Sequence, residues 1–282
     1  AGDYFGSVPD RKVMIFHNLT PPEYFDVLLP ETATYLREGQ RQLQGLRDKV
    51  DLSLTHSAFN LAELRRLGFS PVGFIHQPID RARLELPPDP GVERRWGRKP
   101  GDLLFVGRIA PNKRFEDLLL TFAYYRRFVM PEARLFLVGD AASTGPYLEH
   151  LKKFIAALDL DGVVFAGHTS HAELLAYYRL GRVFLCLSEH EGFCVPVLEA
   201  MHFNLPVAAR AAGAVPETLG GAGILIEKFD PAETAELLGL LAADGPVREK
   251  IVAGQRDRLQ AYHSLSLEKT IRENLSRWLE TR

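Results

Sequence analysis

From residue 101 onward, short apolar runs alternate with amphipathic segments. The segments 113–128, 147–160 and 171–180 carry apolar residues at helical spacing. Six apolar runs before, between and after them predict buried strands: 102–107, 134–139, 163–167, 182–188, 205–210 and 223–226. Apolar strands that alternate with helices are typical of a parallel sheet covered on both faces. We therefore predict a doubly wound α/β domain whose ligand crevice lies beyond the carboxyl ends of its strands.

The first ninety residues repeat this pattern in a shorter form. Their candidate strands and helices lie at 12–17, 51–56 and 72–76, and at 31–49 and 57–67. A complete domain of this kind needs about six strands and roughly 150 residues. We therefore predict a partial Rossmann-like domain over 1–90, with a sheet edge near 12–17.

The remaining boundaries follow from composition. Prolines and glycines crowd the stretch 86–102, which predicts a linker over 91–101. Residues 102–262 then form the second domain. The final segment, 263–282, is predicted to be a helix that returns to the first domain, with Trp278 packed on it.

Composition excludes several classes of protein. The 282 residues are 46% hydrophobic and 25% charged, as in ordinary globular proteins. A net charge of -2 argues against a nucleic-acid partner, although a phosphorylated ligand needs only local positive charge. No transmembrane run or signal pattern is found, so we predict a cytoplasmic protein. Cys186 and Cys194 are expected to be reduced thiols rather than a disulfide or a metal site.

The strongest chemical signal is the segment SEHEGFCVPVLEAM, residues 188–201. A strand is followed by a short loop and a helix, so the amides from Gly192 to Val195 lie at a helix N-terminus that can bind an anion. Glu191 lies in the loop and Glu199 eight residues later. A carboxylate accepts two hydrogen bonds, which suits a vicinal diol. The alternative is a surface carboxylate and one that complements the helix dipole.

A second signal is the segment FVGRIAPNK, residues 105–113. Arg108 follows a strand end directly and therefore stands at the crevice. Lys113 begins the next helix, where a cation opposes the helix dipole unless an anion compensates it. These positions favour binding of a diphosphate over two merely solvated cations.

Together these segments resemble retaining glycosyltransferases of the GT-B fold, family 4 (group 1). Glu191 and Glu199 match the E-x7-E motif of that family, and 105–113 matches its pyrophosphate motif. The segment 215–225 matches its next block. The resemblance is strong over about 101–262, and it implies two Rossmann-like domains. It makes 1–90 the acceptor side and 102–262 the donor-binding domain.

The resemblance also implies residue roles. Arg108 and Lys113 would hold the diphosphate and stabilise charge on the leaving group. Glu199 would bind the ribose. The transferred sugar would be bound by Glu191 and by the amides that follow it: Gly192, Phe193, Cys194 and Val195.

Three further residues are candidates at strand ends. His17 would face the donor sugar across the cleft and act as a catalytic residue. The alternative is a loop histidine that only forms hydrogen bonds. His168 and Thr169 would wall the nucleobase pocket, or play no part in binding. No histidine set has a metal-ligand spacing that we accept.

The chain also departs from the family pattern. Cys194 stands where the family usually has glycine, which leaves less room beside the sugar. His202 and Asn204 replace a small residue and a glycine; Asn204 suits a left-handed helix cap, and His202 is expected to pack. Residues 159–161 read formally as the metal motif D-x-D, but they precede a strand and so lie at the wrong end of the sheet.

The sequence thus predicts transfer of a hexose from a UDP- or GDP-sugar to an acceptor hydroxyl. The transfer is expected to retain the anomeric configuration and to need no metal or cofactor. The acceptor would be a saccharide, a lipid-linked molecule or a small molecule, and contact with a membrane surface is compatible with this. The alternatives are a sugar-nucleotide epimerase on the same fold and a non-catalytic sugar-nucleotide-binding subunit.

Overall fold

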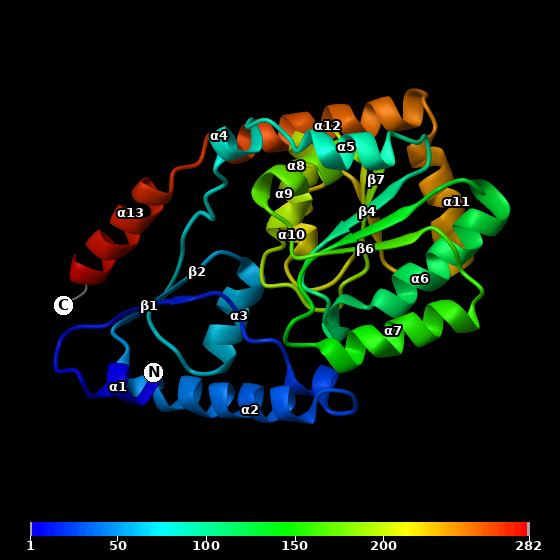
Figure 1. The fold of residues 1–282 in the computed structure, drawn as a ribbon. Coiled ribbons are helices and arrows are strands. Elements are labelled where there is room, and N and C mark those ends of the chain that lie inside the picture. The colour runs from blue at the N-terminus through cyan, green and yellow to red at the C-terminus, as the bar shows by residue number, and fades with distance from the viewer. Residues whose placement is uncertain (1, 281–282) are drawn as a thin grey trace.

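The computed structural model describes residues 2–280, which form two α/β units, each built on a parallel sheet (Figure 1). The first unit has three strands and the helices between and beside them. Its elements are α1 (Gly2–Ser7), β1 (Val13–Phe16), α2 (Pro30–Gly45), β2 (Leu52–Thr55), α3 (Ala58–Arg66) and β3 (Val72–Phe74). All three strands lie where the apolar runs predict them.

The first sheet has the strand order β1-β2-β3. In its parallel register, Val13 pairs with Leu52 and Ser53 with Val72. β1 pairs only with β2 among the described residues, so it is an edge strand, as predicted for this stretch. Its side chains Val13 and Ile15 are exposed.

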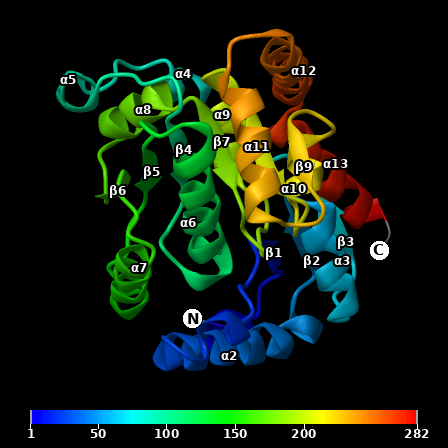
Figure 2. The same ribbon diagram turned by 90° about the vertical axis from the view of Figure 1, so that its right-hand side faces the viewer.

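Each face of the first sheet carries an apolar cluster. One face packs in a cluster that includes Phe16, Leu64 and Phe69. The other face packs against α13 (Leu267–Glu280), which contacts β3 and lies beside it in Figure 2. Here Trp278 is buried in one cluster with Leu52, Leu54 and Ile75. The last helix therefore returns to the first unit, and Trp278 makes the contact expected of it.

The second unit holds the larger core. Its strands are β4 (Leu103–Val106), β5 (Leu135–Val138), β6 (Val163–Gly167), β7 (Val183–Cys186), β8 (Val207–Arg210) and β9 (Ile224–Ile226). Its helices are α6 (Phe115–Tyr124), α7 (Gly145–Ala157), α8 (His171–Leu180), α9 (Val195–His202), α10 (Val215–Leu219), α11 (Pro231–Ala242) and α12 (Pro246–His263). All six predicted strands are present.

The strand order β6-β5-β4-β7-β8-β9 is that of a doubly wound parallel sheet. α6 packs on α7 and α11, while α9 packs on α10 and α12. The two groups of helices cover opposite faces of the sheet (Figures 1 and 2). The order reverses between β4 and β7, so the loops that follow these two strands meet at the crevice. These loops carry the two strongest motifs.

The stretch predicted as a linker is not extended. It contains α5 (Pro90–Trp96), which packs on α8 of the second unit. The Asp89 side chain accepts from the backbone N–H of Val92 and so caps this helix. The short helix α4 (Arg81–Leu84) lies in the segment that crosses between the units. Proline at the first position of a helix is favourable, which explains why this proline-rich stretch folds as a helix.

Within the described residues, no helix combines the length and the apolar character needed to cross a membrane.

Candidate functional site

A cavity of about 220 Å³ lies between the two units, at the carboxyl ends of β1, β4 and β7. Both strong motifs and the predicted histidine contribute to its wall. The lining residues are His17, Asn18, Thr20, Arg108, Asn112, Lys113, His190, Glu191 and Gly192. The structure therefore brings His17, Arg108, Lys113 and Glu191 together from segments as far apart as 174 positions, and the roles expected of them stay predictions.

Lys113 and Glu191 form an ion pair inside this cavity. The Lys113 Nζ to Glu191 Oε1 distance is 2.7 Å, and the side chains are only 17% and 11% exposed. Burial alone would lower the pKa of Lys113, but the charge of Glu191 and its hydrogen bond with the ammonium raise the pKa overall. The lysine is therefore held as a cation, and Arg108 adds a second, exposed cation to the same wall.

Asn112 fixes the loop that carries Glu191. Its side-chain amide donates to the backbone carbonyl of His190, and the backbone carbonyl of Asn112 accepts from the N–H of Glu189. The carbonyl of Glu191 accepts from the N–H of Ala214. The loop is thus held through its backbone atoms, and the carboxylate of Glu191 faces the cavity, where it pairs with Lys113.

A charged network lies beside this loop. Arg210 contacts Asp117 at 2.7 Å and Glu189 at 3.1 Å. Arg114 contacts the same two carboxylates, at 3.1 and 3.4 Å. The network ties the ends of β7 and β8 to the start of α6, and it therefore stabilises the position of Lys113.

Gly192 is one point of close contact between the second unit and the first. Its carbonyl accepts from Ser57 Oγ at 2.8 Å and from Asn60 Nδ2 at 3.1 Å. A Cβ at this position would lie 2.7 Å from both the Cβ of Asn18 and the carbonyl of His17. Only glycine allows the two units to approach this closely, because such a contact is shorter than real Cβ atoms show.

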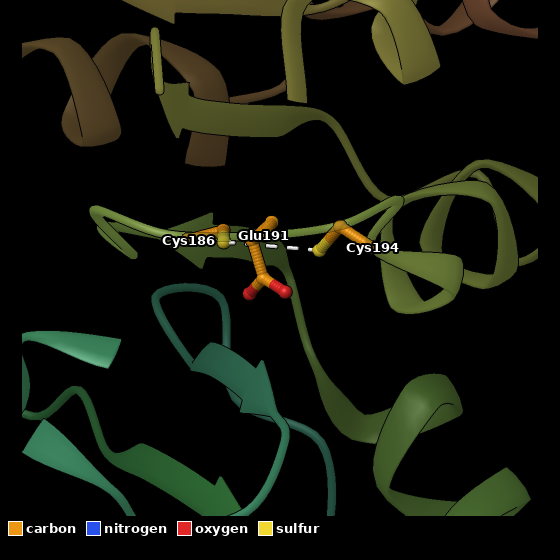
Figure 3. Close-up of side chains that lie close together, drawn as sticks. All are labelled: Cys186, Glu191 and Cys194. Carbon is orange, nitrogen blue, oxygen red and sulfur yellow. Dashed lines mark hydrogen bonds between the residues drawn. The ribbon is translucent and has the colours of Figure 1, made fainter. Parts of the chain in front are cut away.

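Cys194 lies just before α9 with φ of 71°, in the left-handed region. Glycine adopts this conformation at no steric cost, which explains why the family usually has glycine here. The thiol is also close to a second one: Cys186 Sγ and Cys194 Sγ are 4.0 Å apart. The ligand atoms of Cys186, Glu191 and Cys194 all lie within 4.8 Å of one another (Figure 3). These three side chains could hold a metal ion.

Glu199 lies on α9, apart from the cavity. Among the described residues, it is not part of the cavity wall; instead, its carboxylate accepts from Tyr178 Oη at 2.6 Å. Burial raises the pKa of Glu199, while Tyr178, His171 and Arg83 act in the opposite direction. The two motif glutamates thus have different surroundings: Glu191 is paired with a cation, and Glu199 with a hydroxyl.

The other predicted residues have mixed positions. Phe193 packs near Tyr262, with ring centroids 6.1 Å apart, and Val195 begins α9. His168 and Thr169 follow the edge strand β6, two strands away from β4, and His168 is exposed. Neither lines the cavity in the described part of the chain, so their nucleobase role stays a prediction.

Some residues that shape the site were not predicted from the sequence. They are Asn18, Ser57, Asn60, Asn112, Arg114, Asp117, Glu189 and Arg210. Asn112 and Glu189 could have been found, because they lie inside or next to the two motifs. Ser57 and Asn60 act through contacts more than 130 positions away, which no local pattern reveals.

Known proteins resemble this chain in sequence. Residues 93–258 match the family model described as glycosyl transferases group 1. The sulfoquinovosyl transferase SQD2 of Arabidopsis thaliana is 34% identical over 165 residues, which are 57% of this chain and 30% of that protein. A D-inositol 3-phosphate glycosyltransferase of Streptomyces bingchenggensis is 29% identical over 243 residues, 77% of this chain and 50% of that protein. The chain thus spans half or less of the length of these two relatives.

Solved structures share the fold. The HepE protein of Anabaena, in a complex with UDP and glucose, superposes with a TM-score of 0.71 at 20% identity, over 96% of this chain and 72% of that one. Sucrose-phosphate synthase from Thermosynechococcus elongatus superposes with a TM-score of 0.74 at 22% identity, over 99% and 70%. The family match covers more than half of the chain and includes the motifs at Arg108, Lys113, Glu191 and Glu199. The chain therefore belongs to the glycosyl transferases group 1 family and has the Rossmann-like fold of GT-B glycosyltransferases.

Proposed function

We propose that this chain binds a nucleoside diphosphate sugar, UDP- or GDP-linked, and transfers its hexose to an acceptor hydroxyl with retention and without a metal ion. One observation carries the proposal most directly. Arg108, Lys113 and Glu191 meet in one cavity at the carboxyl ends of β4 and β7, where a doubly wound sheet binds its ligand.

The charges of this cavity suit a diphosphate. The guanidinium of Arg108 and the ammonium of Lys113 would bind its oxygens. These groups would stabilise the negative charge that develops on the departing diphosphate. Two fixed cations thereby perform the task that a divalent ion performs in other enzymes.

The carboxylates suit the hydroxyl-bearing parts of the donor. Glu191 faces the cavity and would accept hydrogen bonds from the sugar, and Glu199 would accept them from the ribose. His17 lines the same cavity from the first unit and would contact the sugar from the opposite side. The HepE complex with UDP and glucose supports this choice of ligand class.

The contact between the units suits transfer of the sugar to an acceptor. Ser57 and Asn60 hold the carbonyl of Gly192, so the first unit closes directly over the loop that carries Glu191. Closure of this kind excludes water from the reacting sugar and favours transfer over hydrolysis. The acceptor would then enter from the side of the first unit.

The test is incubation with a panel of UDP- and GDP-hexoses in the presence of a chelator, with and without candidate acceptors. We expect release of the nucleoside diphosphate from one donor and an α-linked product, detected by NMR, from an α-linked donor. A C2-epimerised sugar would support the epimerase instead. Tight binding without turnover by the intact protein would indicate a non-catalytic subunit.

A further inference from the structure

Two thiols and a carboxylate converge beside the donor cavity. Cys186 ends β7, and the chain then forms the loop with Glu191 and returns to Cys194 at the start of α9. Figure 3 shows the two sulfurs directed toward each other beside the Glu191 side chain. Both cysteines are free and buried. No role proposed above uses the sulfurs.

The separation of the sulfurs fits one metal ion. Zinc binds thiolate sulfur at about 2.3 Å in tetrahedral geometry, which places two sulfurs about 3.8 Å apart. The Cys186 and Cys194 sulfurs are 4.0 Å apart, so an ion fits between them with little movement. The Glu191 carboxylate, within 4.8 Å of both, needs only a small shift to become a third ligand. Soft sulfur ligands favour zinc-like ions over magnesium or calcium.

The charges also balance. Two thiolates and one carboxylate carry three negative charges, and a divalent ion leaves one. Lys113, 2.7 Å from Glu191 Oε1, supplies the remaining positive charge and becomes an outer partner of the ligating carboxylate. The buried cluster is then neutral overall, which matters because an unpaired buried charge is costly.

Protons must leave when the ion binds. Both thiols give up their protons to form the two metal–sulfur bonds, so the affinity for the ion should rise with pH. Glu191 lines the cavity, so the cluster of the three ligands adjoins the cleft.

We propose that Cys186, Glu191 and Cys194 form a binding site for a thiophilic divalent cation of the zinc type. Occupation of this site withdraws Glu191 from the donor site and therefore inhibits the enzyme. The binding of the ion is independent of the proposed function, and only the inhibition rests on it.

The direct test is titration of the phosphine-reduced protein with Cd²⁺, followed by the ultraviolet absorbance of cadmium–thiolate bonds. The chain has only two cysteines, so a band of this kind identifies the site. We expect one equivalent of Cd²⁺ to bind, and Zn²⁺ to displace it. Glu191→Gln should weaken binding by about tenfold or more and keep the band.

Cys194→Gly and Cys186→Ala are the matched variants. Cys194→Gly is suited to the left-handed φ at this position and should therefore stay folded, which circular dichroism checks. Each variant should weaken the band and lower the affinity for Cd²⁺ by about tenfold or more. Absence of the band in the wild-type protein, or unchanged affinity in both cysteine variants, would overturn the proposal.

Measurements of enzyme activity with and without Zn²⁺ distinguish failure of the metal-site proposal from failure of the proposed transferase function. Zn²⁺ should inhibit nucleotide release by the wild-type protein, and Cys186→Ala should lose this inhibition relative to its own rate without zinc. A cadmium band in a protein that turns over no donor would support the metal site and count against the transferase. Turnover that Zn²⁺ inhibits equally in wild-type and Cys186→Ala proteins would contradict the inhibitory role.

Discussion

Lys113 Nζ lies 2.7 Å from Glu191 Oε1, across the crevice between the loops that follow β4 and β7. The two residues are 78 positions apart, and both side chains are mostly buried. A buried ion pair is weak evidence for stability, because desolvation offsets the attraction. Its position in the proposed donor cavity points instead to a role in binding, since Glu191 holds Lys113 as a cation there.

Removal of one partner of this pair should be strongly destabilising. In Lys113→Met, Glu191 is left as an unpaired buried carboxylate, so we expect a loss of about 3–5 kcal/mol in the free energy of unfolding near neutral pH. Urea unfolding measures this loss. The exposed pair of Lys152 and Glu149 is the matched control, and Lys152→Met should change stability by less than about 1 kcal/mol.

The stabilisation from Lys113 also depends on pH in a defined direction. Its pKa is raised in the folded state, so its contribution is complete below the unfolded value of about 10.4 and is lost as the pH rises through the folded value. The wild-type protein should therefore lose stability relative to Lys113→Met only above about pH 10. Equal pH dependence of the two proteins in that alkaline range would contradict this assignment.

Gly192→Ala should impair transfer more than nucleotide binding. The added Cβ would meet Asn18 and the carbonyl of His17 at 2.7 Å, so the first unit cannot close over the loop. We expect a fall in kcat of about tenfold or more, with the affinity for UDP or GDP little changed. Gly254→Ala on α12, where an added Cβ meets nothing within 4 Å, is the control and should keep full activity.

The sequence predicted the second unit well because its strands are continuous apolar runs. The strands of this sheet can be predicted from their apolar residues alone. The loops that follow β4 and β7 then contain Arg108, Lys113 and Glu191. The helix α5 was not predicted, although Asp89 and Pro90 are a normal helix start, because prolines and glycines nearby favoured a linker. The proline and glycine content of the stretch was given more weight than the helix-start signal at Asp89 and Pro90.

Contacts between distant segments could not be predicted in the same way. Arg210 and Asp117 meet across 93 positions, and their pairing depends on how β8 lies next to β7. The two cysteines were expected to form no metal site, yet the loop between them returns and places their sulfurs 4.0 Å apart. Spacing along the chain indicates neither relationship, because tertiary structure decides both.

Glu199→Gln should stabilise the protein and weaken nucleotide binding. Burial raises the pKa of Glu199, so its ionised form reduces stability at neutral pH, and this penalty disappears as the pH falls below the unfolded value of about 4.3. The variant should therefore melt at a higher temperature than wild type near pH 7, and at a similar temperature near pH 4. Glutamine can still accept from Tyr178.

The control for Glu199 is Glu236→Gln, an exposed position on α11. It should change neither the melting temperature nor nucleotide affinity. If Glu199→Gln leaves the affinity for UDP and GDP unchanged, Glu199 does not bind the ribose.

Trp278→Ala should destabilise the first unit. Trp278 is buried in one cluster with Leu52, Leu54 and Ile75, so truncation leaves a large cavity and should cost about 3–5 kcal/mol. Hydrogen exchange should show faster exchange in β2 and β3, with β4 to β9 unaffected. Leu279→Ala, at the exposed neighbouring position, should have little effect.

Recognition of a diphosphate by the crevice cations is the central claim, and calorimetric titration with UDP and GDP in the presence of a chelator measures this recognition directly. We predict that at least one nucleotide binds, and that Arg108→Ala binds it about tenfold or more weakly, because a charge-assisted hydrogen bond contributes about 1.5–3 kcal/mol. Arg94→Ala, an exposed position on α5, should bind it as wild type does. Failure of both nucleotides to bind, or equal affinity in the Arg108→Ala protein, would contradict the account.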